Sequence, residues 1–545
     1  MATNAKFKTP DPVNETILSY ARGSEERRRL KAKIAELDSQ EIEIPLIIGG
    51  KEVRTGKLGT CVKPHEHRHR LATFHQATPE CIDSAVKAAR DASADWARMP
   101  WEHRVSIFLK AAELLAGPYR DILNASTMLG QSKNVFQAEI DSACEMIDFF
   151  RFNARYAQEI YEEQPQVHAR GVWNRLEQRP LEGFVFAVTP FNFTSIAGNL
   201  PTAPAIMGNT VLWKPASTSV YSNYFIMKLL QEAGLPPGVI NFLPGSGSTV
   251  GNPILNQPGL AGIHFTGSTE VFHGMWRTIG ENIKKYKGYP RIVGETGGKD
   301  FIFAHVSADQ PSLVTALLRG SYEYQGQKCS AASRAFIPRS LWKSVSESLR
   351  AQLQEMKMGP VEDFSNFVNA VIDQKAFKSI SGYIEHARTA SDAQIFCGGT
   401  TKDQDGYFIE PTVILCKNPN YRSMSEEIFG PVLSIYVYED STFEETLKIC
   451  DEASPYALTG AVFAQDRTAI VKMSDRLVHT AGNFYINDKP TGAVVGQQPF
   501  GGSRASGTND KAGSKLNLLR WVTPRTIKEN FVPPSQYPYP FMTEP

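Results

Sequence analysis

One carboxylate and one thiol stand 34 residues apart near the middle of the chain. The carboxylate is Glu295, within the glycine-rich stretch Gly-Glu-Thr-Gly-Gly-Lys, and the thiol is Cys329. A cysteine sulfur can act as a nucleophile, and a carboxylate can activate water as a base. The adjacent cation of Lys328 is expected to favour the thiolate over the thiol. Taken alone, the two residues also fit a buried core cysteine and a glycine turn.

The elements before Glu295 alternate regularly between short apolar strands and helices. The predicted strands are Gly183–Val188, Thr210–Trp213, Val239–Leu243, Gly262–Phe265 and Arg291–Val293. Helical segments over Tyr221–Ala233 and Thr269–Tyr286 occupy two of the gaps. This alternation predicts a parallel sheet with helices on both faces.

Four residues that could form a site directly follow predicted strands. They are Asn192, Lys214, Gly267 and Glu295. In parallel α/β sheets, ligands bind beyond the carboxyl ends of the strands. We therefore expect these four residues to converge on one edge of the sheet.

The rhythm of strands and helices resumes after Cys329 and predicts a second α/β domain. Strands are expected over 333–337, 394–396 and 432–438, and helices over 342–354, 377–389 and 443–453. The segment Val167–Glu182 indicates a hairpin outside this pattern. The tail from Trp521 onward is expected to be an arm rather than a packed element, because it contains Pro533, Pro534, Pro538 and Pro540.

A chain of 545 residues exceeds a single ordinary core, so several domains are expected. Hydrophobic residues make up 42% and charged residues 21%, which is typical of a soluble globular protein. The net charge of +1 provides no field that would attract nucleic acid or a membrane. No apolar run approaches the roughly 18 residues needed to span a bilayer. Seven scattered cysteines indicate a reducing compartment rather than a disulfide framework.

His65, His67 and His69 alternate, as ligands on one face of a strand would. Without a second ligand cluster at a usable spacing, this pattern favours a solvated surface strand, and no metal site is predicted. The first 38 residues lack the apolar region of a secretory signal and do not have the pattern of a mitochondrial presequence. The expectation is a soluble intracellular protein, cytoplasmic as the sequence stands, or in the mitochondrial matrix if a presequence is absent from this chain.

Six motifs in order resemble the aldehyde dehydrogenase superfamily over about residues 45–530. They are Thr189-Pro190-Phe191-Asn192-Phe193, Trp213-Lys214-Pro215-Ala216, Phe265-Thr266-Gly267-Ser268, Gly294-Glu295-Thr296-Gly297-Gly298-Lys299, Gly326-Gln327-Lys328-Cys329 and Glu427-Ile428-Phe429-Gly430-Pro431-Val432. Further segments resemble the pyrroline-5-carboxylate dehydrogenases within that superfamily. These segments are 137–141, 149–153, 326–334, 495–502 and 509–510.

The resemblance implies an α/β aldehyde dehydrogenase fold with two parallel-sheet domains and an oligomerisation arm. It implies an NAD-binding domain over 1–164 and 183–294, a catalytic domain over 295–510, and a hairpin and arm over 165–182 and 511–545. The implied reaction is the NAD-dependent oxidation of L-glutamate γ-semialdehyde to L-glutamate, the last step of proline breakdown. In this reaction Cys329 attacks the aldehyde, Asn192 stabilises the oxyanion with the backbone N–H of Cys329, and Glu295 activates water for the thioester.

The resemblance also implies the cofactor contacts. Lys214 binds the adenosine ribose, Glu427 holds the nicotinamide ribose, Phe429 walls the nicotinamide, and Thr189 contributes its backbone. The pyrophosphate and adenine lie along Gly267, Ser268, Thr269, Glu270 and Val271. Many relatives carry a glutamate three positions after the lysine, where this chain has the neutral Ser217. A hydroxyl does not repel a 2′-phosphate, so NADP use is not excluded.

For the substrate, the resemblance places Glu145 against the ammonium group, with Lys328 beside it. This role replaces the solvated helix position that its apolar neighbours alone would predict. Phe193 and Phe500 are expected to sandwich the carbon chain. The carboxylate is expected at Ser330, Gly492 and Ala493, the last of which lacks the hydroxyl that close relatives often have there.

Two alternative functions remain open at this stage. One is an aldehyde dehydrogenase for a different semialdehyde, and the other is a non-catalytic NAD-binding protein with the same fold. The implied partners are further copies of the chain, as a homodimer or a larger homo-oligomer, and a proline dehydrogenase that hands over its product.

Overall fold

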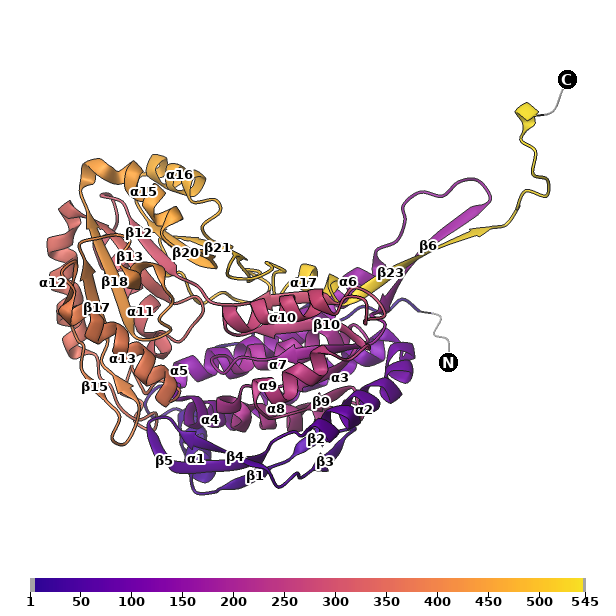
Figure 1. Cartoon of the computed structure of the whole chain (residues 1–545), viewed down its shortest axis with the longest axis horizontal. Helices are drawn as coiled ribbons and strands as arrows, with labels where there is room; N and C mark the ends of the chain where they lie inside the picture. The colour runs from indigo at the N-terminus through magenta and orange to yellow at the C-terminus, as the bar shows by residue number, and fades with distance from the viewer. Residues whose placement is uncertain (1–4, 543–545) are drawn as a thin grey trace.

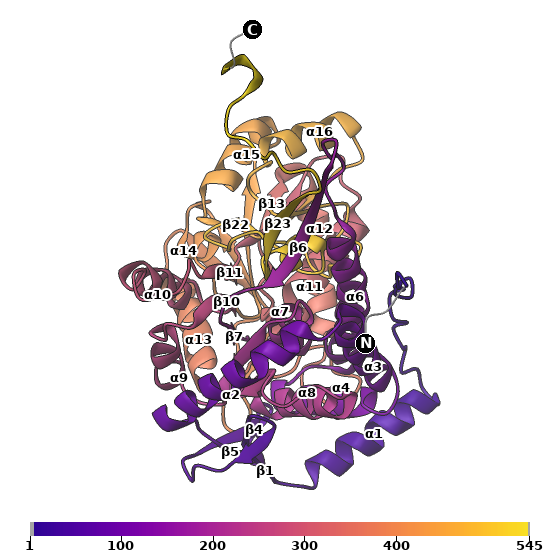
Figure 2. The ribbon, with the colours of Figure 1, turned by 90° about the vertical axis from the view of Figure 1, so that its right-hand side faces the viewer.

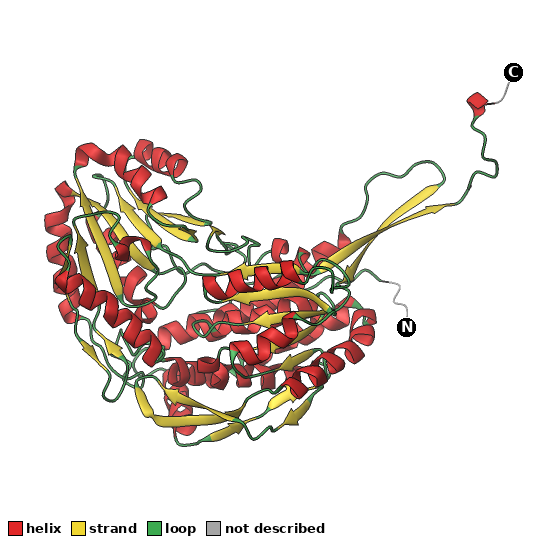
Figure 3. Cartoon of the chain, viewed as in Figure 1, coloured by secondary structure: helices red, strands yellow, loops and turns green. Residues whose placement is uncertain are grey.

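The computed structural model describes residues 5–542 and has two lobes, each built on a seven-stranded sheet (Figure 1). The first lobe contains the N-terminal half of the chain, and the second contains most of the residues from 300 to 490. In each lobe, helices lie on both faces of the sheet (Figure 3). The α/β class and the two parallel-sheet domains predicted from the sequence are therefore confirmed.

The sheet of the first lobe has the strand order β11-β10-β7-β8-β9-β2-β3. The strands span Arg291–Glu295 (β11), Leu260–Thr266 (β10), Phe184–Val188 (β7), Thr210–Lys214 (β8), Ile240–Phe242 (β9), Leu46–Ile48 (β2) and Lys51–Val53 (β3). Strands β11 to β9 are parallel, and only β2 and β3 at one edge pair in the antiparallel sense. The five parallel strands are those predicted from the sequence, to within about two residues at each end.

Alternate residues of β7 pack into two different cores, one on each face of the sheet. Phe184 and Phe186 pack with α2, α9 and α10, whereas Val185 and Ala187 pack with α3, α4, α6, α7 and α8. The helices span Pro79–Arg98 (α2), Trp101–Ala116 (α3), Arg120–Gln131 (α4), Met146–Glu162 (α6), Thr194–Ile206 (α7), Val220–Ala233 (α8), Gly247–Leu255 (α9) and Thr269–Glu281 (α10). Burial on both faces explains why the strands read as nearly continuous apolar runs.

The sheet of the second lobe has the order β14-β17-β18-β13-β12-β20-β21. The strands span Ala393–Cys397 (β14), Thr412–Cys416 (β17), Val432–Tyr438 (β18), Ala332–Pro338 (β13), Asp300–Ala304 (β12), Thr459–Phe463 (β20) and Asn483–Ile486 (β21). All neighbours are parallel except β14 and β17. One face packs on α11 (Gln310–Tyr322) and α12 (Arg339–Glu355), and the other on α13 (Gln374–Thr389), α15 (Phe443–Glu452) and α16 (Arg467–Arg476).

Shorter elements complete the two lobes. A helix at Glu25–Asp38 (α1) precedes a three-stranded sheet of Ile42–Ile44 (β1), Glu66–His75 (β5) and Leu58–Lys63 (β4). Two small strand pairs join Thr401–Lys402 (β15) to Phe408–Ile409 (β16), and Tyr456–Ala457 (β19) to Ser503–Arg504 (β22). Short helices occupy Val135–Ala138 (α5), Arg422–Ser425 (α14) and Lys515–Leu519 (α17).

A two-stranded ribbon projects from the body and carries the C-terminal segment at its tip (Figures 1 and 2). It pairs β6 (Val172–Pro180) with β23 (Val522–Asn530) in an antiparallel register of nine residue pairs. The predicted hairpin at Val167–Glu182 is therefore wrong, because β6 finds its partner near the C-terminus and not within the same segment. The prediction that the tail is unpacked from Trp521 is also wrong at its start, since Trp521 is fully buried in the first lobe.

The three alternating histidines do not share one environment. His65 is buried and lies 3.1 Å from the Ser132 hydroxyl and 3.3 Å from a Glu362 carboxylate oxygen, so the surface position predicted for it is wrong. His67 stacks on Tyr407. Within residues 5–542, no three histidine, cysteine or acidic side chains are grouped so that they could hold a metal ion. None of the helices in that range has the length and apolar character needed to cross a membrane.

Candidate active site

The carboxyl ends of four parallel strands of the first sheet form one row. In the ladder, Gly294 pairs with Phe265, Phe265 with Val188, and Val188 with Lys214. Glu295 ends β11 and Lys214 ends β8. The sequence prediction that residues after these strands converge on one edge is therefore confirmed.

The thiol and the carboxylate meet at this edge. Cys329 Sγ lies 3.0 Å from Glu295 Oε1, in the geometry of a thiol that donates to the carboxylate. Two glycines allow the close approach of the chain segments around them. A Cβ atom on Gly298 would lie 2.4 Å from the Cys329 carbonyl oxygen, and one on Gly297 would lie 1.8 Å from a Glu427 carboxylate oxygen. The Gly-Gly pair after Glu295 thus brings the nucleophile loop and Glu427 against the same turn.

An unusual backbone turn positions Cys329. Tyr324, Gln325 and Gly326 all have positive φ, at 50°, 55° and 64°. Such conformations cost free energy for non-glycine residues and persist only where the surroundings impose them. The side-chain amide of Gln325 imposes this turn by donating to the carbonyls of Ser132 and Ala370 at 2.9 and 2.8 Å.

Burial sets the protonation of the pair. It raises the pKa of Glu295 to about 7, although the hydrogen bond from Cys329 and the charge of Lys511 act in the opposite direction. Burial, followed by the negative charge of Glu295, raises the pKa of the Cys329 thiol well above its usual range. The prediction that Lys328 favours a thiolate is wrong for this arrangement, because Lys328 donates to Glu323 at 2.9 Å. The structure instead favours a neutral thiol that shares its proton with Glu295.

Asn192 follows β7 and is held close to the nucleophile loop. Its side-chain Nδ2 donates to the Gln327 carbonyl at 3.0 Å, two residues before Cys329. One N–H of this amide remains for another acceptor. Among residues 5–542, no group accepts the backbone N–H of Cys329. Two donors are thus free near the sulfur, although Asn192 is not among the residues that line the neighbouring cavity.

The residues predicted to contact a cofactor lie along the same strand ends. The ammonium group of the buried Lys214 forms no hydrogen bond or ion pair with residues 5–542, and burial lowers its pKa to about 8. Gly267 and Ser268 lead from β10 into α10, which begins at Thr269, continues through Glu270 and exposes Val271. The Thr189 hydroxyl accepts a hydrogen bond from the Trp213 indole at 3.0 Å.

Two of these residues come from the second lobe. The Glu427 carboxylate accepts the backbone N–H of Gly298 at 3.0 Å, and burial raises its pKa to about 7. Phe429 has a φ of 57°, and its ring meets Phe191 edge to face at 5.8 Å between centroids. A cation on one lobe and a carboxylate with an aromatic ring on the other thus face the same row of strand ends.

A cavity of about 390 Å³ lies beside Cys329 and Glu295. All seven residues predicted to contact the substrate line it, namely Glu145, Phe193, Lys328, Ser330, Gly492, Ala493 and Phe500. The structure therefore brings together side chains from residue 145 to residue 500 around the reactive thiol.

Glu145 reaches this cavity from a π-helical turn. Residues Glu139–Glu145 form a single π-helix between α5 and α6, and such turns are frequent at functional sites. Glu145 Oε2 lies 2.5 Å from the Ser195 hydroxyl, which also lies 2.8 Å from Asp141 Oδ1. A hydroxyl carries one proton, so both contacts are satisfied only when one carboxyl is protonated. Burial and the charge of Asp141 raise the pKa of Glu145 to about 8, which makes Glu145 the protonated partner.

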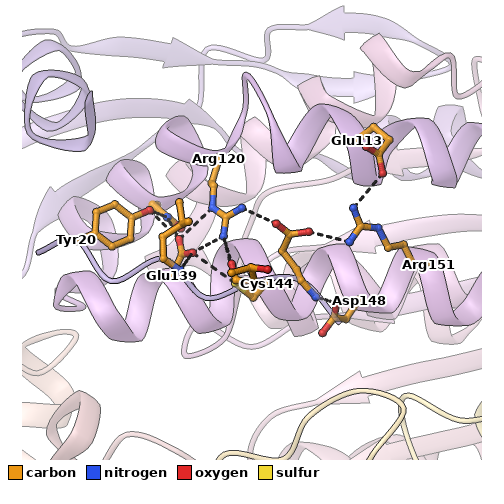
Figure 4. A network of polar contacts seen from close by, with 11 residues as sticks. Tyr20, Glu113, Arg120, Glu139, Cys144, Asp148 and Arg151 are labelled. Atoms are coloured by element: carbon orange, nitrogen blue, oxygen red, sulfur yellow. Dashed lines mark hydrogen bonds and ion pairs between the residues drawn. The ribbon is translucent and has the colours of Figure 1, made fainter. Parts of the chain in front are cut away.

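The N-terminal segment 5–20 packs across the π-helix and contributes to the cavity wall. The Tyr20 hydroxyl and the Leu18 N–H both donate to the Glu139 carboxylate, which also pairs with Arg120 (Figure 4). The Glu15 carboxylate bridges Arg120 and Arg151 at 2.8 and 2.7 Å. Asn14, Glu15 and Ile17 line the cavity.

Sequence reasoning missed three further cavity residues. Asp148 accepts the Asn14 side-chain amide at 2.8 Å, and burial raises its pKa to about 6. The Thr491 hydroxyl lies 2.8 Å from that of Ser330. Lys489 precedes it on the same loop. Asp148 lies one helical turn after Glu145 and was detectable by that spacing, whereas no local pattern marks Thr491 or Lys489.

Comparison with known proteins gives consistent results. The profile of the Aldehyde dehydrogenase family matches residues 53–527. The mitochondrial delta-1-pyrroline-5-carboxylate dehydrogenase of Dictyostelium discoideum is 57% identical over 547 residues, covering 100% of this chain and 98% of that protein. A crystal structure of the delta-pyrroline-5-carboxylate dehydrogenase of Mycobacterium tuberculosis, bound with NAD, is 52% identical with a TM-score of 0.96 and covers 99% of this chain and 100% of that one.

A third relative is a longer protein. The crystal structure of proline utilization A from Bdellovibrio bacteriovorus is 29% identical with a TM-score of 0.91, and the match covers 98% of this chain and 55% of that one. The family profile matches most of the chain, and the fold and the thiol–carboxylate pair agree with it. The chain therefore belongs to the aldehyde dehydrogenase family.

Proposed function

We propose that this enzyme oxidises L-glutamate γ-semialdehyde, the open form of 1-pyrroline-5-carboxylate, to L-glutamate with NAD. One observation carries the proposal: a single cavity joins the Cys329–Glu295 pair to a second carboxyl, Glu145, that does not contact the thiol. A substrate with an aldehyde at one end and an ammonium group at the other matches this arrangement. The names of the relatives from Dictyostelium and Mycobacterium support the same substrate.

The first step forms a carbon–sulfur bond. As Cys329 Sγ attacks the aldehyde carbon, its proton passes to Glu295, 3.0 Å away. The oxygen of the resulting thiohemiacetal accepts hydrogen bonds from the Asn192 amide and the Cys329 backbone N–H, each such donor contributing a few kcal/mol to lowering the barrier. Bound NAD supplies the two-electron acceptor that converts the thiohemiacetal into a thioester.

The second step is hydrolysis. Glu295 releases its proton to solvent and, once ionised, takes a proton from the water that attacks the thioester carbon. The carbon–sulfur bond breaks, L-glutamate leaves, and the sulfur regains its proton. A pKa of about 7 suits this double use, because both forms of Glu295 are well populated near neutral pH.

The chain's residues fit NAD. The buried cation of Lys214 lacks a carboxylate partner within residues 5–542, so it is available to ribose hydroxyls. The N-terminal turn of α10, from Thr269 to Val271, offers free N–H groups to the pyrophosphate, and Gly267 and Ser268 lead the chain into it. Glu427 would hold the nicotinamide ribose and Phe429 would wall the ring. Ser217 donates weakly to the Gly245 carbonyl at 3.4 Å and carries no charge, so this position does not repel the 2′-phosphate of NADP.

The proposed functions of the domains correspond to the two lobes and the ribbon. Residues 1–164 and 183–294 would bind the cofactor, residues 295–510 would carry the nucleophile, and 165–182 with 511–545 would mediate assembly. The ribbon of β6 and β23 and the segment beyond it support assembly with a second copy of the chain. They expose the apolar side chains of Trp173, Phe531, Val532, Tyr537, Tyr539 and Phe541.

Two further proposals concern the cellular setting. The Dictyostelium relative is named as mitochondrial, which supports a mitochondrial matrix location for this enzyme. In proline utilization A, a unit of this fold accounts for 55% of a longer chain. That arrangement supports a proline dehydrogenase as the partner that supplies the substrate here.

The deciding experiment measures NADH formation from 1-pyrroline-5-carboxylate, with NADP in a parallel assay. The wild type should be active, and Cys329→Ala should show no NADH formation above background, because the covalent route is lost. The matched control is Cys397→Ala, which removes a free, partly exposed thiol on β14. Activity in Cys329→Ala would contradict the mechanism, and an inactive wild type that oxidises another semialdehyde would contradict the substrate.

A further inference from the structure

A pair of lysines that share one glutamate borders the cavity on the side of the second lobe. Lys489 Nζ lies 2.8 Å from both carboxylate oxygens of Glu323, and Lys328 Nζ lies 2.9 Å from one of them. Burial alone would raise the pKa of Glu323, but the charges of Lys328 and Lys489 lower it to about 2, so the carboxylate is ionised. Two cations thus face one anion, and one positive charge is left without a partner in this cluster.

The two lysines border the predicted carboxylate position. Lys328 and Lys489 both line the cavity, together with Ser330, Thr491 and Gly492, whereas Glu323 does not line it. A Cβ atom on Gly492 would lie 3.7 Å from Cε and 3.9 Å from Nζ of Lys489. Gly492 has a φ of +96°, a conformation that favours glycine. The backbone at Gly492 therefore runs beside the Lys489 ammonium group.

Other charged groups around Lys489 do not cancel this charge. Burial lowers the pKa of Lys489, and the positive charges of Lys328 and Arg319 act in the same direction, whereas Glu323 raises it. Arg319 lies on α11 and is exposed. The exposed carboxylate of Asp488 accepts the backbone N–H of Lys489 at 2.7 Å. Glu323 is the only carboxylate within residues 5–542 that contacts the Lys489 ammonium.

We propose that Lys489 binds the α-carboxylate of the substrate. Glu323 holds the side-chain ammonium group of Lys489 in place. This inference rests on the proposed substrate. Ala493 lacks a hydroxyl, and the Ser330 and Thr491 hydroxyls are 2.8 Å apart. One of these hydroxyls donates to the other, so a single O–H remains for the carboxylate, and Lys489 of the second lobe supplies the cation. The ammonium group is bound by Glu145 from the first lobe. A zwitterionic amino-acid end bridges the two lobes, and specificity requires both charges.

The test compares three aldehydes that differ in the charged groups at their far end, succinate semialdehyde being one carbon shorter than the other two. L-glutamate γ-semialdehyde carries a carboxylate and an ammonium, succinate semialdehyde carries only a carboxylate, and pentanal carries neither. In Lys489→Met, KM for the two carboxylate substrates should rise roughly 10- to 100-fold, which is the loss expected for a charged hydrogen bond. KM for pentanal and kcat for all three should change little. Lys489→Arg should retain most of the affinity.

The controls distinguish a loss of carboxylate binding from a loss of folding, and the role of Lys489 from the identity of the substrate. Lys472→Met removes a surface lysine paired with Glu444 and should leave all three KM values unchanged. If Lys489→Met does not fold, as judged by its thermal unfolding, Lys489→Gln keeps a donor for Glu323 and decides the question. Unchanged KM for the carboxylate substrates, or an equal rise for pentanal, would overturn the role of Lys489. If the wild type is inactive on L-glutamate γ-semialdehyde, the proposed function is contradicted instead. The role of Lys489 is then still tested by comparing the change in KM for succinate semialdehyde with that for pentanal.

Discussion

The cavity contains two glutamates that experience the same physical effect but have different partners. Burial raises the pKa of Glu295 to about 7 and that of Glu145 to about 8. Glu295 faces a thiol at 3.0 Å, whereas Glu145 faces the Ser195 hydroxyl at 2.5 Å. Burial alone therefore does not define a catalytic base. The group at hydrogen-bond distance decides whether the carboxyl exchanges a proton with the reacting centre or binds a charged ligand.

The electrostatic surroundings of the two carboxyls differ as well. The cation of Lys511 acts on Glu295 and partly offsets the rise in its pKa that burial causes. Glu145 lies among the carboxyls of Asp141 and Asp148, with Lys133 as the opposing charge. An incoming ammonium group relieves the repulsion among these acidic residues, and this makes the Glu145 region a better cation site than the Glu295 region.

The largest effect should follow from removing the carboxylate of the reacting region. Glu295→Gln is expected still to form the thioester, with the Cys329 proton passing to solvent instead of to residue 295. It should hydrolyse the thioester roughly 100- to 10,000-fold more slowly, because a general base contributes about that factor. A pre-steady-state burst of NADH followed by slow turnover is the expected readout. The comparison would break if steady-state turnover were normal, because Glu295 would then not be the base.

The same change at the recognition region should have a smaller and different effect. Glu145→Gln is expected to raise KM for L-glutamate γ-semialdehyde roughly 10- to 100-fold, the loss of one charged hydrogen bond. KM for succinate semialdehyde, which has no ammonium group, should change little. Loss of kcat with an unchanged KM would show that Glu145 acts on the reaction and not on the amine.

The smallest expected effect is on the pH dependence of the unfolding temperature. It tests the raised pKa of Glu145 without any substrate. A carboxyl whose folded pKa is raised contributes stability that is present below its unfolded value near 4.5 and is lost as pH rises through the folded value. For Glu145 this window extends from about 4.5 to about 8. The unfolding temperature of the wild type should therefore fall relative to Glu145→Gln between pH 5.5 and pH 8.5. A constant difference across this range would show that the Glu145 pKa is not raised.

The sequence predicted the frame of the site better than its details. The parallel strands were recognisable because burial on both faces makes them apolar, and the residues that follow them converge by geometry. The role of Glu145 was not predictable from periodicity, because an ordinary helix places it beside the apolar stripe and only the π-turn directs it into the cavity. The partner of β6 was missed because strand pairing leaves no local signal, and Lys489 was missed because its significance depends on Glu323, 166 residues earlier.

The pairing of β6 with β23 has a consequence for synthesis of the protein. The second strand leaves the ribosome about 340 residues after the first, a delay of roughly 20 to 70 s at about 5 to 20 residues per second. Throughout that time β6 is an unpaired edge, which is a template for association with other chains. A chaperone or a neighbouring molecule that covers β6 until β23 is synthesised would prevent such association.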